Sequence, residues 1–474
     1  MAAPHVLRGR AARQGAAISP RLHDAGRRTA LRLREAPSLR FAYAMAIAGQ
    51  TLAGYRLVLL RRRRAPVAVR QAALRAEHQR NAERIYAAVL HLQGLMIKIG
   101  QTLGSNPAGV PAPYIDVLSR LQDAVPPRPW PLIRPAIEAG LGRSPEEAFA
   151  RIEPRAVAAA SLAQVHRATL HDGREVAVKV LYPGIERLVR SDLRVLRTLL
   201  WLESRFAGYP LQPVYDELAH NVPLEVDLLH EAEAMAEMAA LLAGDAAVKI
   251  PRALPELSSR RVLVMEWIDG IKITDVAGLR AAGLDPQQLC ERLTDLYCRQ
   301  IFDFGFFHAD PHPGNLFALR DGRLALVDFG LTRRLPRPVV RGLALLSRAI
   351  MTSDDAGAVE AFGLLGFRLR DSNNQEALIA TANFFRAVTD PATYAAAAQA
   401  GDAEETLRAV NEAMRRANRA NPFVDFPGEI TLVSRVFGLM TGVGVGMGAS
   451  PNVLQPVLRW TAPLLDGVTP SRPA

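Results

Sequence analysis

The sequence predicts an α+β fold in which a small strand-rich segment is followed by a larger helical one. Within residues 151–270, "HDG" in "ATLHDGREVAVKV" predicts a hairpin turn between two apolar strands. "RRVLVMEWIDG" predicts a further strand that ends at a glycine. From about residue 337 onward the chain is predicted to be helical, with loops near 370 and 420. This order is the layout of a two-lobed nucleotide-binding enzyme.

The positive charge of the chain is concentrated at its N-terminus. With 474 residues, two or three structural units are expected. The first 80 residues contain 17 arginines and three acidic residues, whereas the remainder is nearly neutral. A basic arm of this kind binds an anionic partner. It lacks interleaved aromatic residues and any nucleic-acid-binding module, so a lipid surface is preferred and no nucleic acid is expected; a solvated tail is the alternative.

Residues 41–64, "FAYAMAIAGQTLAGYRLVLLRRRR", are the candidate membrane segment. The apolar run reaches spanning length only if Gln50 and Arg56 are included, which is marginal for crossing a bilayer. An interfacial helix anchored by the arginines at 61–64 fits better, and a spanning helix or an ordinary packing helix are the alternatives. We therefore expect peripheral attachment to the cytoplasmic side of a membrane. The two cysteines form no disulfide framework, which agrees with a reducing compartment.

Four segments are predicted along the chain. The basic arm with its possible interfacial helix covers 1–65, and a helical extension covers 66–150. In the extension, apolar residues from Ile85 to Leu103 recur at spacings that predict one helix over about 66–104. The strand-rich lobe covers 151–270 and the helical lobe covers 271–474. Further helices are predicted over about 185–206, 212–243 and 286–305.

The stretches "FHADPHPGN" and "LALVDFG" carry the strongest chemical signal. Asp310 and Asn315 fit the pattern H-x-D-x-x-x-x-N, and Asp328 opens a D-F-G triplet after a predicted strand. In phosphoryl transfer, Asp310 would orient or deprotonate the acceptor, while Asn315 and Asp328 would hold Mg²⁺ through hard oxygen ligands. The alternatives are a transition-metal site built from His308, Asp310 and His312, and a purely structural polar turn.

A cation for the phosphates and a carboxylate to orient it are also present. Lys179 lies in the apolar strand "EVAVKV", as does the lysine of the pattern V-A-I-K. "PLEVDLLHEAEAM" offers Glu225, Asp227, Glu231 and Glu233 on one predicted helix, where Asp227 and Glu231 share a face. A solvent-exposed lysine and a solvated acidic face are the plain alternatives.

The nucleotide base and the phosphates need backbone partners. After the strand "VLVM", the Glu266 carbonyl and the Ile268 amide are the predicted adenine partners. Where a kinase usually has a glycine-rich loop, this chain has four residues with side chains, whose β-carbons stiffen the turn and favour a helix: Ala158, Ala159, Ala160 and Ser161. The glycine-rich "GVGVGMG" at 442–448 has no lysine after it and is predicted to be a helix that packs closely through its glycines.

Taken in order, "KIGQ", "AAAS", "VAVKVLYPG", "EVD", "HADPHPGN" and "DFG" resemble the motifs of the UbiB family of atypical kinases over about residues 75–460. The resemblance implies a protein-kinase-like two-lobed fold with a small strand-rich N-lobe, a helical C-lobe and an N-terminal helical extension. It implies ATP and Mg²⁺ as cofactors, an ion pair between Lys179 and Glu231, Asp310 as the catalytic aspartate, and Asn315 and Asp328 as metal ligands. It also implies that further residues fold over the cleft: Lys98, Gln101, Glu225 and Asp227.

Such a cover would fill the groove where a protein substrate lies, and no A-P-E element follows the D-F-G triplet. The expected function is therefore a membrane-associated ATPase or small-molecule kinase that supports isoprenoid-quinone or lipid metabolism. Its expected partners are ATP, an anionic membrane, and a small molecule or protein of such a pathway. A nucleotide-sensing scaffold is the second hypothesis, and a conventional protein kinase is the third.

Overall fold

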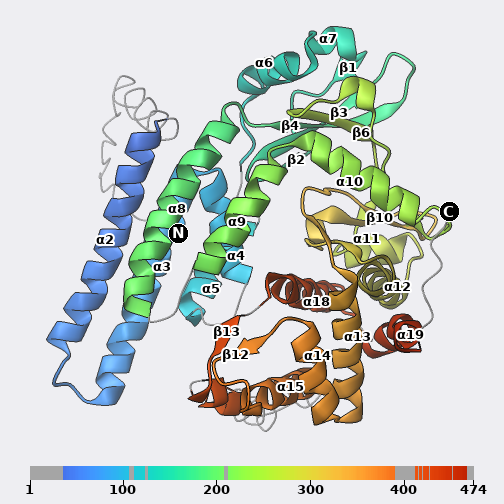
Figure 1. Cartoon of the computed structure of the whole chain (residues 1–474). Helices are drawn as coiled ribbons and strands as arrows, with labels where there is room; N and C mark the ends of the chain where they lie inside the picture. Colours follow the sequence, from blue (N-terminus) through green and yellow to red (C-terminus); the bar gives the residue numbers. More distant parts are fainter. Residues whose placement is uncertain are drawn as a thin grey trace, which may run out of the picture. The chain divides into compact units, whose positions relative to one another are not determined.

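The computed structural model divides into two compact units (Figure 1). It describes residues 36–105, 111–122, 126–207, 212–389, 412–414, 416–418, 420–425, 427–450 and 452–466. The predicted basic arm at residues 1–35 lies outside the described residues. One unit comprises Met1–Val125 with Glu186–Gly208, and the other comprises Pro126–Ile185 with Tyr209–Ala474. Helices and small sheets occur together, which confirms the α+β prediction.

The first unit is a helical bundle in which α2 and α3 run antiparallel (Figure 1). Its elements are α2 (Pro37–Arg61), α3 (Val67–Leu92), α4 (Leu95–Ser105), α5 (Ala112–Leu118), the 3₁₀ turn η1 (Ser119–Gln122) and α8 (Ile185–Ala207). Burial of apolar side chains from all of these regions holds the bundle together. The core consists of Ala44, Val89, Leu92, Met96, Ile97, Leu118, Leu121 and Val195.

The prediction of a single helix over 66–104 is wrong in one respect, because the structure has two helices there, α3 and α4. Gln93 has a φ of 54° with a ψ of −165°, and Gly94 has a φ of 62°; positive φ values lie outside the α-helical region, so the helix ends here. The predicted apolar stripe is nevertheless buried, since Val89, Leu92 and Met96 all join the core. Beyond the break, a β-carbon at Gly100 would clash with the Leu121 side chain, which explains the glycine of "KIGQ".

A buried ion pair joins α2 to α8. Arg40 donates from Nε and Nη2 to Asp192 Oδ1 at 2.9 and 2.7 Å, and from Nη2 to Oδ2 at 2.6 Å. Arg40 Nη1 also donates to the carbonyl of Leu92 at 2.6 Å. The two side chains are 1% and 0% exposed. Burial raises the pKa of Asp192 to about 6 even though the Arg40 guanidinium opposes that rise, so desolvation is a large part of the energetics.

The second unit begins with an antiparallel sheet in the order β1-β3-β4-β6, with β2 beside β3. The predicted "HDG" turn is confirmed, because Leu170 N donates to Arg174 O and Gly173 has a φ of 86°. The central strand β4 is buried on both faces from Val176 to Val180. The elements of this part of the unit are α6 (Trp130–Leu141), α7 (Pro145–Ala148), β1 (Arg151–Ile152), β2 (Ala158–Ala159), β3 (Ala163–Thr169), β4 (Glu175–Leu181), β5 (Val248–Lys249), η2 (Pro255–Leu257) and β6 (Val262–Glu266).

The helix predicted over 212–243 is two helices, α9 (Gln212–Glu225) and α10 (Leu228–Leu241). Pro223 lies in the last turn of α9, and Asp227 caps α10 by accepting a hydrogen bond from Leu229 N at 3.1 Å. Asp227 and Glu231 therefore do not lie on one continuous helix, contrary to the prediction. The new helix start gives Glu231 a fixed place in the first turn of α10.

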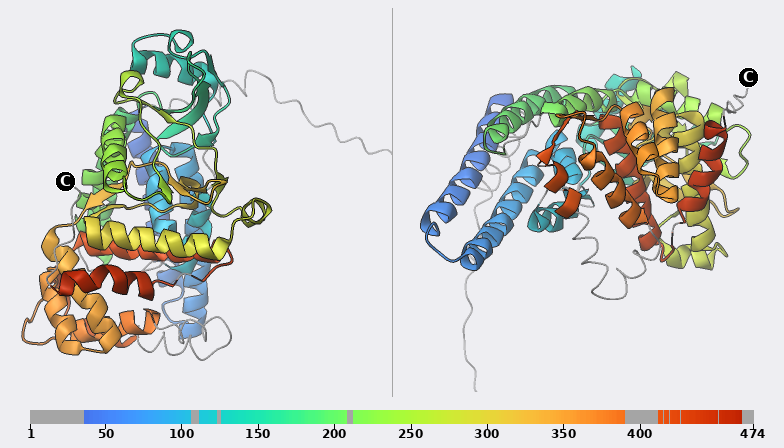
Figure 2. Two further views of the ribbon diagram at one scale, coloured as in Figure 1. Left: turned by 90° about the vertical axis from the view of Figure 1, so that its right-hand side faces the viewer. Right: turned by 60° about the horizontal axis from the view of Figure 1, so that its bottom comes forward.

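The remaining elements form the helical part of the second unit, in which α12 packs against α18 and α19 (Figure 2). Two short strands pair where loops were predicted near 370 and 420. The elements are β7 (Ile271–Lys272), α11 (Val276–Ala281), α12 (Pro286–Arg299), the π-helical η3 (Gln300–Phe304), β8 (Phe306–His308), η4 (Pro313–Asn315), β9 (Leu316–Ala318), β10 (Leu324–Leu326), β11 (Thr332–Arg334), α13 (Arg337–Thr352), α14 (Asp355–Leu364), β12 (Arg368–Leu369), α15 (Glu376–Thr389), β13 (Phe423–Asp425), α18 (Gly428–Gly446) and α19 (Leu454–Leu465).

Helix α18 confirms that the C-terminal glycine-rich stretch is helical up to Gly446, where a β-carbon would lie 3.5 Å from the Thr274 side chain, but two of its other glycines do not pack closely. A β-carbon at Gly438 or Gly442 would meet no atom of the described residues within 4 Å. Among those residues, α18 is also the helix that is long and apolar enough to cross a membrane, and 41% of that window is buried in the protein. A core helix passes the same test, so this finding is weak evidence for a membrane span. The segment predicted to lie at the interface, 41–64, does not pass the test.

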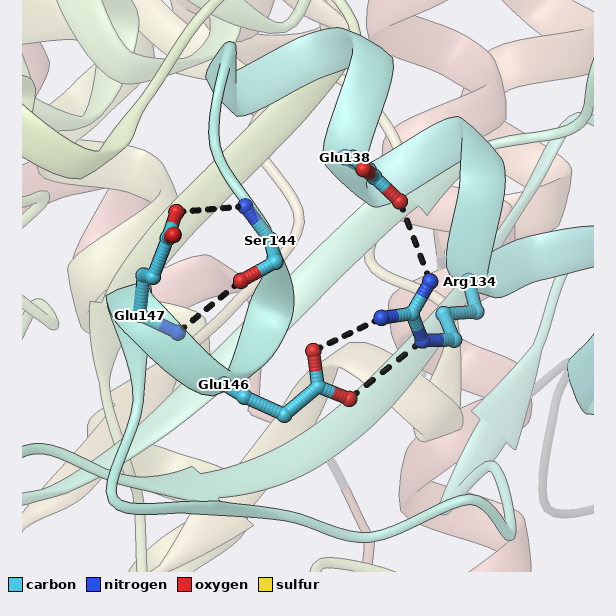
Figure 3. A network of polar contacts seen from close by, with 5 residues as sticks. All are labelled: Arg134, Glu138, Ser144, Glu146 and Glu147. Carbon is cyan, nitrogen blue, oxygen red and sulfur yellow. Dashed lines mark hydrogen bonds and ion pairs between the residues drawn. The ribbon is translucent and has the colours of Figure 1, made fainter.

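Polar contacts at the surface orient α6 and α7, the helices that precede the first strand of the sheet (Figure 3). Ser144 and Glu147 form a reciprocal capping box at the start of α7, with bonds of 3.3 and 3.0 Å. Arg134 of α6 bridges Glu138 at 3.0 Å and Glu146 at 2.8 Å. Because these side chains are solvent-exposed, the pairs orient the α6–α7 corner and contribute little net stability.

The buried Arg40–Asp192 pair yields a stability prediction. Asp192→Ala should lower the free energy of unfolding by about 3 to 5 kcal/mol, because it removes the buried carboxylate that the Arg40 guanidinium binds. Urea unfolding followed by circular dichroism measures the change. Asp172→Ala, which breaks an ion pair with the exposed Arg174, is the matched control and should unfold as the wild type does. An equal effect of both variants, or no recovery in an Arg40→Leu/Asp192→Leu double variant, would contradict this interpretation.

Candidate functional site

Lys179, at the centre of β4, is held by carboxylates from two distant segments. Its Nζ lies 2.8 Å from both Glu231 Oε1 and Oε2 of α10, and 2.9 Å from Asp328 Oδ1 after β10. The Lys179 side chain is 9% exposed and that of Glu231 is 2% exposed. The solvent-exposed alternative for Lys179 is thereby excluded. The structure brings together three of the residues that the sequence analysis singled out.

The backbone at Asp328 is held in an unusual conformation that aims its carboxylate at Lys179. Asp328 has a φ of 65°, which is uncommon for a residue with a side chain and most tolerated in Asp, Asn and Gly. Its carbonyl bonds to His308 Nε2 at 2.8 Å, and its Oδ1 accepts from Gly330 N at 3.3 Å. Local strain of this kind persists where surrounding bonds over-determine it.

Gly330 lies where three acidic side chains converge. A β-carbon placed on it would lie 3.3 Å from Asp328 Oδ1, 3.7 Å from Glu231 Oε2 and 4.0 Å from Glu225 Cγ. The glycine of the D-F-G triplet therefore permits a close approach of the backbone to the carboxylates. The distance of 4.0 Å to Glu225 Cγ also shows that Glu225, at the end of α9, borders the same cluster.

The charges in this cluster stabilise one another. Burial disfavours the ammonium of Lys179, but the carboxylates of Asp328 and Glu231 outweigh it and raise the pKa of Lys179 above its usual value. Burial also opposes ionisation of Asp328, but Lys179 lowers the pKa of Asp328 to about 2. For Glu231, burial is the larger effect and raises the pKa to about 7 against the attraction of Lys179. Lys179 thus stays a cation and Asp328 an anion at neutral pH.

The catalytic-loop histidine has a structural environment. His308 is fully buried, and its Nδ1 lies 3.0 Å from the Tyr297 hydroxyl while its Nε2 contacts the Asp328 carbonyl. Burial lowers the pKa of His308, so the ring is neutral near pH 7. Because both ring nitrogens are engaged, the alternative transition-metal site with His308 as a ligand is excluded. Within the described ranges, no group of three His, Cys, Asp or Glu side chains could hold a metal.

Asn315 and Asp328 suit Mg²⁺. Val327 N donates to Asn315 O at 3.0 Å, which places Asn315 beside the residue that precedes Asp328. The Asn315 side-chain nitrogen points to the Asp310 carbonyl at 3.4 Å, so its side-chain oxygen is the atom that could ligate a metal. A carboxylate and an amide oxygen, completed by phosphate oxygens and water, are the hard ligands that Mg²⁺ takes in nucleotide sites. The roles of the two residues as ligands remain predictions.

Asp310 has a partner that sequence reasoning missed. Arg435 of α18 places Nη2 3.0 Å from Asp310 Oδ1. The two residues are separated by 125 positions, and Arg435 belongs to no motif in the sequence. A single arginine in an arginine-rich chain carries no local signal, so only the three-dimensional structure could reveal it.

The predicted nucleotide-contacting loops lie at the edge of the sheet. Glu266 is the last residue of β6, and its side chain accepts from Lys249 Nζ at 2.5 Å and from Arg252 N at 3.1 Å. Ile268 follows two residues later and is half-buried. In the alanine-rich segment, Ala158 and Ala159 form β2, which pairs with β3. Ala160 N donates to Ala163 O and closes a tight turn that contains Ser161 and leads into β3, so the helical tendency expected of this segment is overridden by sheet pairing.

The remaining predicted residues are divided between the two units. Lys98 and Gln101 belong to α4 of the first unit, where Gln101 Nε2 donates to the Leu121 carbonyl at 2.9 Å. Asp227 belongs to the second unit and lies 3.4 Å from Arg260 through its Oδ2. The predicted cover of the cleft by Lys98 and Gln101 stays a prediction, because these residues belong to one unit and the residues of the site to the other.

Comparisons with known proteins identify the family of the chain. A family model described as the ABC1 atypical kinase-like domain matches residues 120–362, just over half of the chain. An Arabidopsis thaliana protein named ACTIVITY OF BC1 COMPLEX KINASE 1, chloroplastic, is 38% identical over 58% of this chain and 41% of that protein. An AarF domain-containing protein kinase 1 of Xenopus tropicalis is 34% identical over 58% of this chain and 54% of that protein. The chain thus spans about half the length of the curated relatives that it matches.

A solved structure supports the fold. The Mycobacterium tuberculosis protein Rv3197, described in complex with erythromycin, aligns with a TM-score of 0.53 over 82% of this chain and 98% of that one. At 22% sequence identity, the likeness concerns the fold alone. Together with the matched domain, it confirms the predicted kinase-like class.

The convergence on Gly330 yields a prediction. Gly330→Ala should destabilise the protein by about 1 to 3 kcal/mol, because the new methyl group would lie 3.3 Å from Asp328 Oδ1, which is tighter than an ordinary contact. Gly363→Ala in α14 is the control, since its β-carbon would meet no described atom within 4 Å and alanine favours a helix. Urea unfolding of both variants measures the difference. The interpretation is wrong if Gly330→Ala is as stable as Gly363→Ala.

Proposed function

Because the chain belongs to the ABC1, or UbiB, family of atypical kinases, we propose that it uses Mg-ATP as an atypical kinase or ATPase at a membrane. Its metabolic role in this proposal is the support of isoprenoid-quinone or lipid metabolism. The observation that carries the proposal is the Lys179–Glu231–Asp328 cluster, which lies beside the loop of Asp310 and Asn315. A strand lysine paired with a helix glutamate, together with the aspartate of a D-F-G triplet, is the arrangement that kinases use.

Each side chain has a distinct task in this proposal. Lys179, oriented by Glu231, binds phosphate oxygens that are not transferred, and Asp328 with Asn315 holds the metal. Bound Mg²⁺ neutralises charge on the phosphates. Asp310 orients the acceptor and takes its proton as the acceptor oxygen bonds to the γ-phosphorus, while the bond to the β–γ bridging oxygen breaks and ADP leaves. If water is the acceptor, the same steps amount to ATP hydrolysis.

The α2–α3 turn supports the membrane part of the proposal. The arginines at 61–64 are all exposed. They are flanked by exposed apolar side chains, of which Leu60 is 70% exposed and Val67 is 59% exposed. Adjacent basic and apolar side chains suit the headgroup region of an anionic bilayer. Such a location favours a lipid-soluble or membrane-bound acceptor over a soluble protein.

The second hypothesis, a nucleotide-sensing scaffold, uses the same ATP site without turnover. Asp310→Asn separates the two hypotheses, because a scaffold would keep nucleotide-dependent partner binding and all of its function in that variant. An enzyme would keep nucleotide binding and lose turnover.

The metal-binding role of Asp328 can be tested directly. Asp328→Asn should fold, since asparagine tolerates a positive φ, but it should weaken Mg-dependent ATP binding and lower turnover at least about 100-fold. Isothermal titration calorimetry with and without Mg²⁺ and a phosphate-release assay with anionic vesicles measure both effects. Asp321→Asn, in the exposed turn before β10, is the matched control. Wild-type Mg-ATP affinity and turnover in Asp328→Asn would refute the proposed nucleotide chemistry.

The membrane contact can be tested separately. Replacing the four arginines at 61–64 by glutamine should weaken binding to phosphatidylglycerol vesicles about 100-fold or more, because each arginine near an anionic surface contributes about 1 kcal/mol. Vesicle co-sedimentation at low and high salt measures the loss, and ATP affinity should not change. Unaltered sedimentation would contradict the predicted contact. The control replaces four exposed arginines of the second unit, Arg143, Arg151, Arg174 and Arg320.

A further inference from the structure

Arg435 brings a cation to the proposed catalytic aspartate from outside the matched kinase-like domain. The domain match ends at residue 362, whereas Arg435 lies in the middle of α18. Its Nη2 lies 3.0 Å from Asp310 Oδ1, and the two side chains are 27% and 31% exposed. An ion pair this accessible contributes modestly to stability, so stability alone is a weak reason for an arginine at this place.

The guanidinium of Arg435 has hydrogen-bond donors that Asp310 does not use. An arginine presents five N–H donors in a rigid fork, and the hydrogen bond to Asp310 uses one of them. Arg435 Nε is buried and has no hydrogen-bond partner among the described residues. Nε is therefore out of reach of a ligand, but the Arg435 side chain is 27% exposed, so a ligand oxygen beside Asp310 could accept hydrogen bonds from the outer nitrogens of the guanidinium.

The charge balance of the site points in the same direction. With all groups ionised, Lys179 faces the carboxylates of Glu231 and Asp328, and Asp310 adds a third negative charge. Without Arg435, the carboxylates around the site would outnumber its one cation, Lys179, and would repel the polyanionic phosphates of a nucleotide. Arg435 removes part of that repulsion at the point where the phosphoryl group is transferred.

We propose that Arg435 is a further active-site residue that binds the γ-phosphate of ATP while its contact with Asp310 anchors the guanidinium. Arginine suits this role because it is always charged and its fork matches phosphate oxygens. It would act in cis as the arginine finger of a nucleotide hydrolase does, by stabilising charge on the transferred phosphoryl group. This inference rests on the proposed function and adds a residue to it.

The test compares a nucleotide that has a γ-phosphate with one that lacks it. Affinities for the Mg-bound β,γ-imido analogue of ATP and for Mg-ADP are measured by isothermal titration calorimetry on the full chain. Arg435→Gln should weaken binding of the analogue about 10- to 100-fold, the range for a charged hydrogen bond, while Mg-ADP affinity changes less than about threefold. The affinity of Arg435→Lys for the analogue should lie between those of the wild type and Arg435→Gln, because lysine keeps the charge but lacks the guanidinium fork.

A matched control is present on α19. Arg459 pairs with Asp295 of α12 at 2.9 Å, so it is also an arginine from a C-terminal helix paired with a carboxylate of the kinase-like domain. Arg459→Gln should bind both nucleotides as the wild type does. Circular dichroism shows whether each variant folds. If Arg435→Gln does not fold, the two nucleotide affinities are compared in Arg435→Lys instead.

The outcomes separate the inference from the proposed function. If the wild type binds neither nucleotide, the proposed function itself fails. If the wild type binds both and Arg435→Gln weakens them equally or not at all, Arg435 is a structural residue and the inference fails alone. Tighter binding of the analogue by Arg435→Gln would show that Arg435 blocks the site, and would also overturn the inference.

Discussion

The ammonium of Lys179, shared between Glu231 and Asp328, is the constraint on which the rest of the second unit depends. Its strand is central in the sheet and buried on both faces, so the charge is largely removed from water. A buried charge is tolerated only when it is well paired, and removing one partner is strongly destabilising. Helix α10 and the turn after β10 must therefore both reach β4. The chemistry proposed for the site and the packing of the unit use the same three side chains.

Several local features follow from that requirement. Helix α10 starts at Leu228, capped by Asp227, which puts Glu231 in its first turn. Asp328 takes a positive φ, and the neutral, buried His308 holds its carbonyl. The cap on α10 is stabilising by itself, whereas the positive φ of Asp328 costs free energy that the contacts of the buried cation offset.

Residues close in sequence were predictable, and partners far apart were not. The spacing of Asp310, Asn315 and Asp328 identified the loop, because phosphoryl transfer restricts which side chains can occupy it. The strand that carries Lys179 was recognisable from its apolar alternation, and the UbiB family assignment is confirmed. The break at Gln93 and the division between α9 and α10 were missed, because backbone conformation and capping competed with a continuous apolar pattern. The Arg40–Asp192 and Arg435–Asp310 pairs carry no local signal, since arginine is abundant throughout this chain.

The site pairs each of its two key aspartates with a cation from elsewhere in the chain, Asp328 with Lys179 and Asp310 with Arg435. This arrangement determines what binding of Mg-ATP has to accomplish. In the proposed function, a metal held by Asp328 would compete with Lys179, and the lysine, still paired with Glu231, would be available to phosphate oxygens. Arg435 can turn toward phosphate in the same way while it keeps Asp310. Binding of this kind would exchange one set of charge partners for another, so that the buried cation would keep a counter-charge.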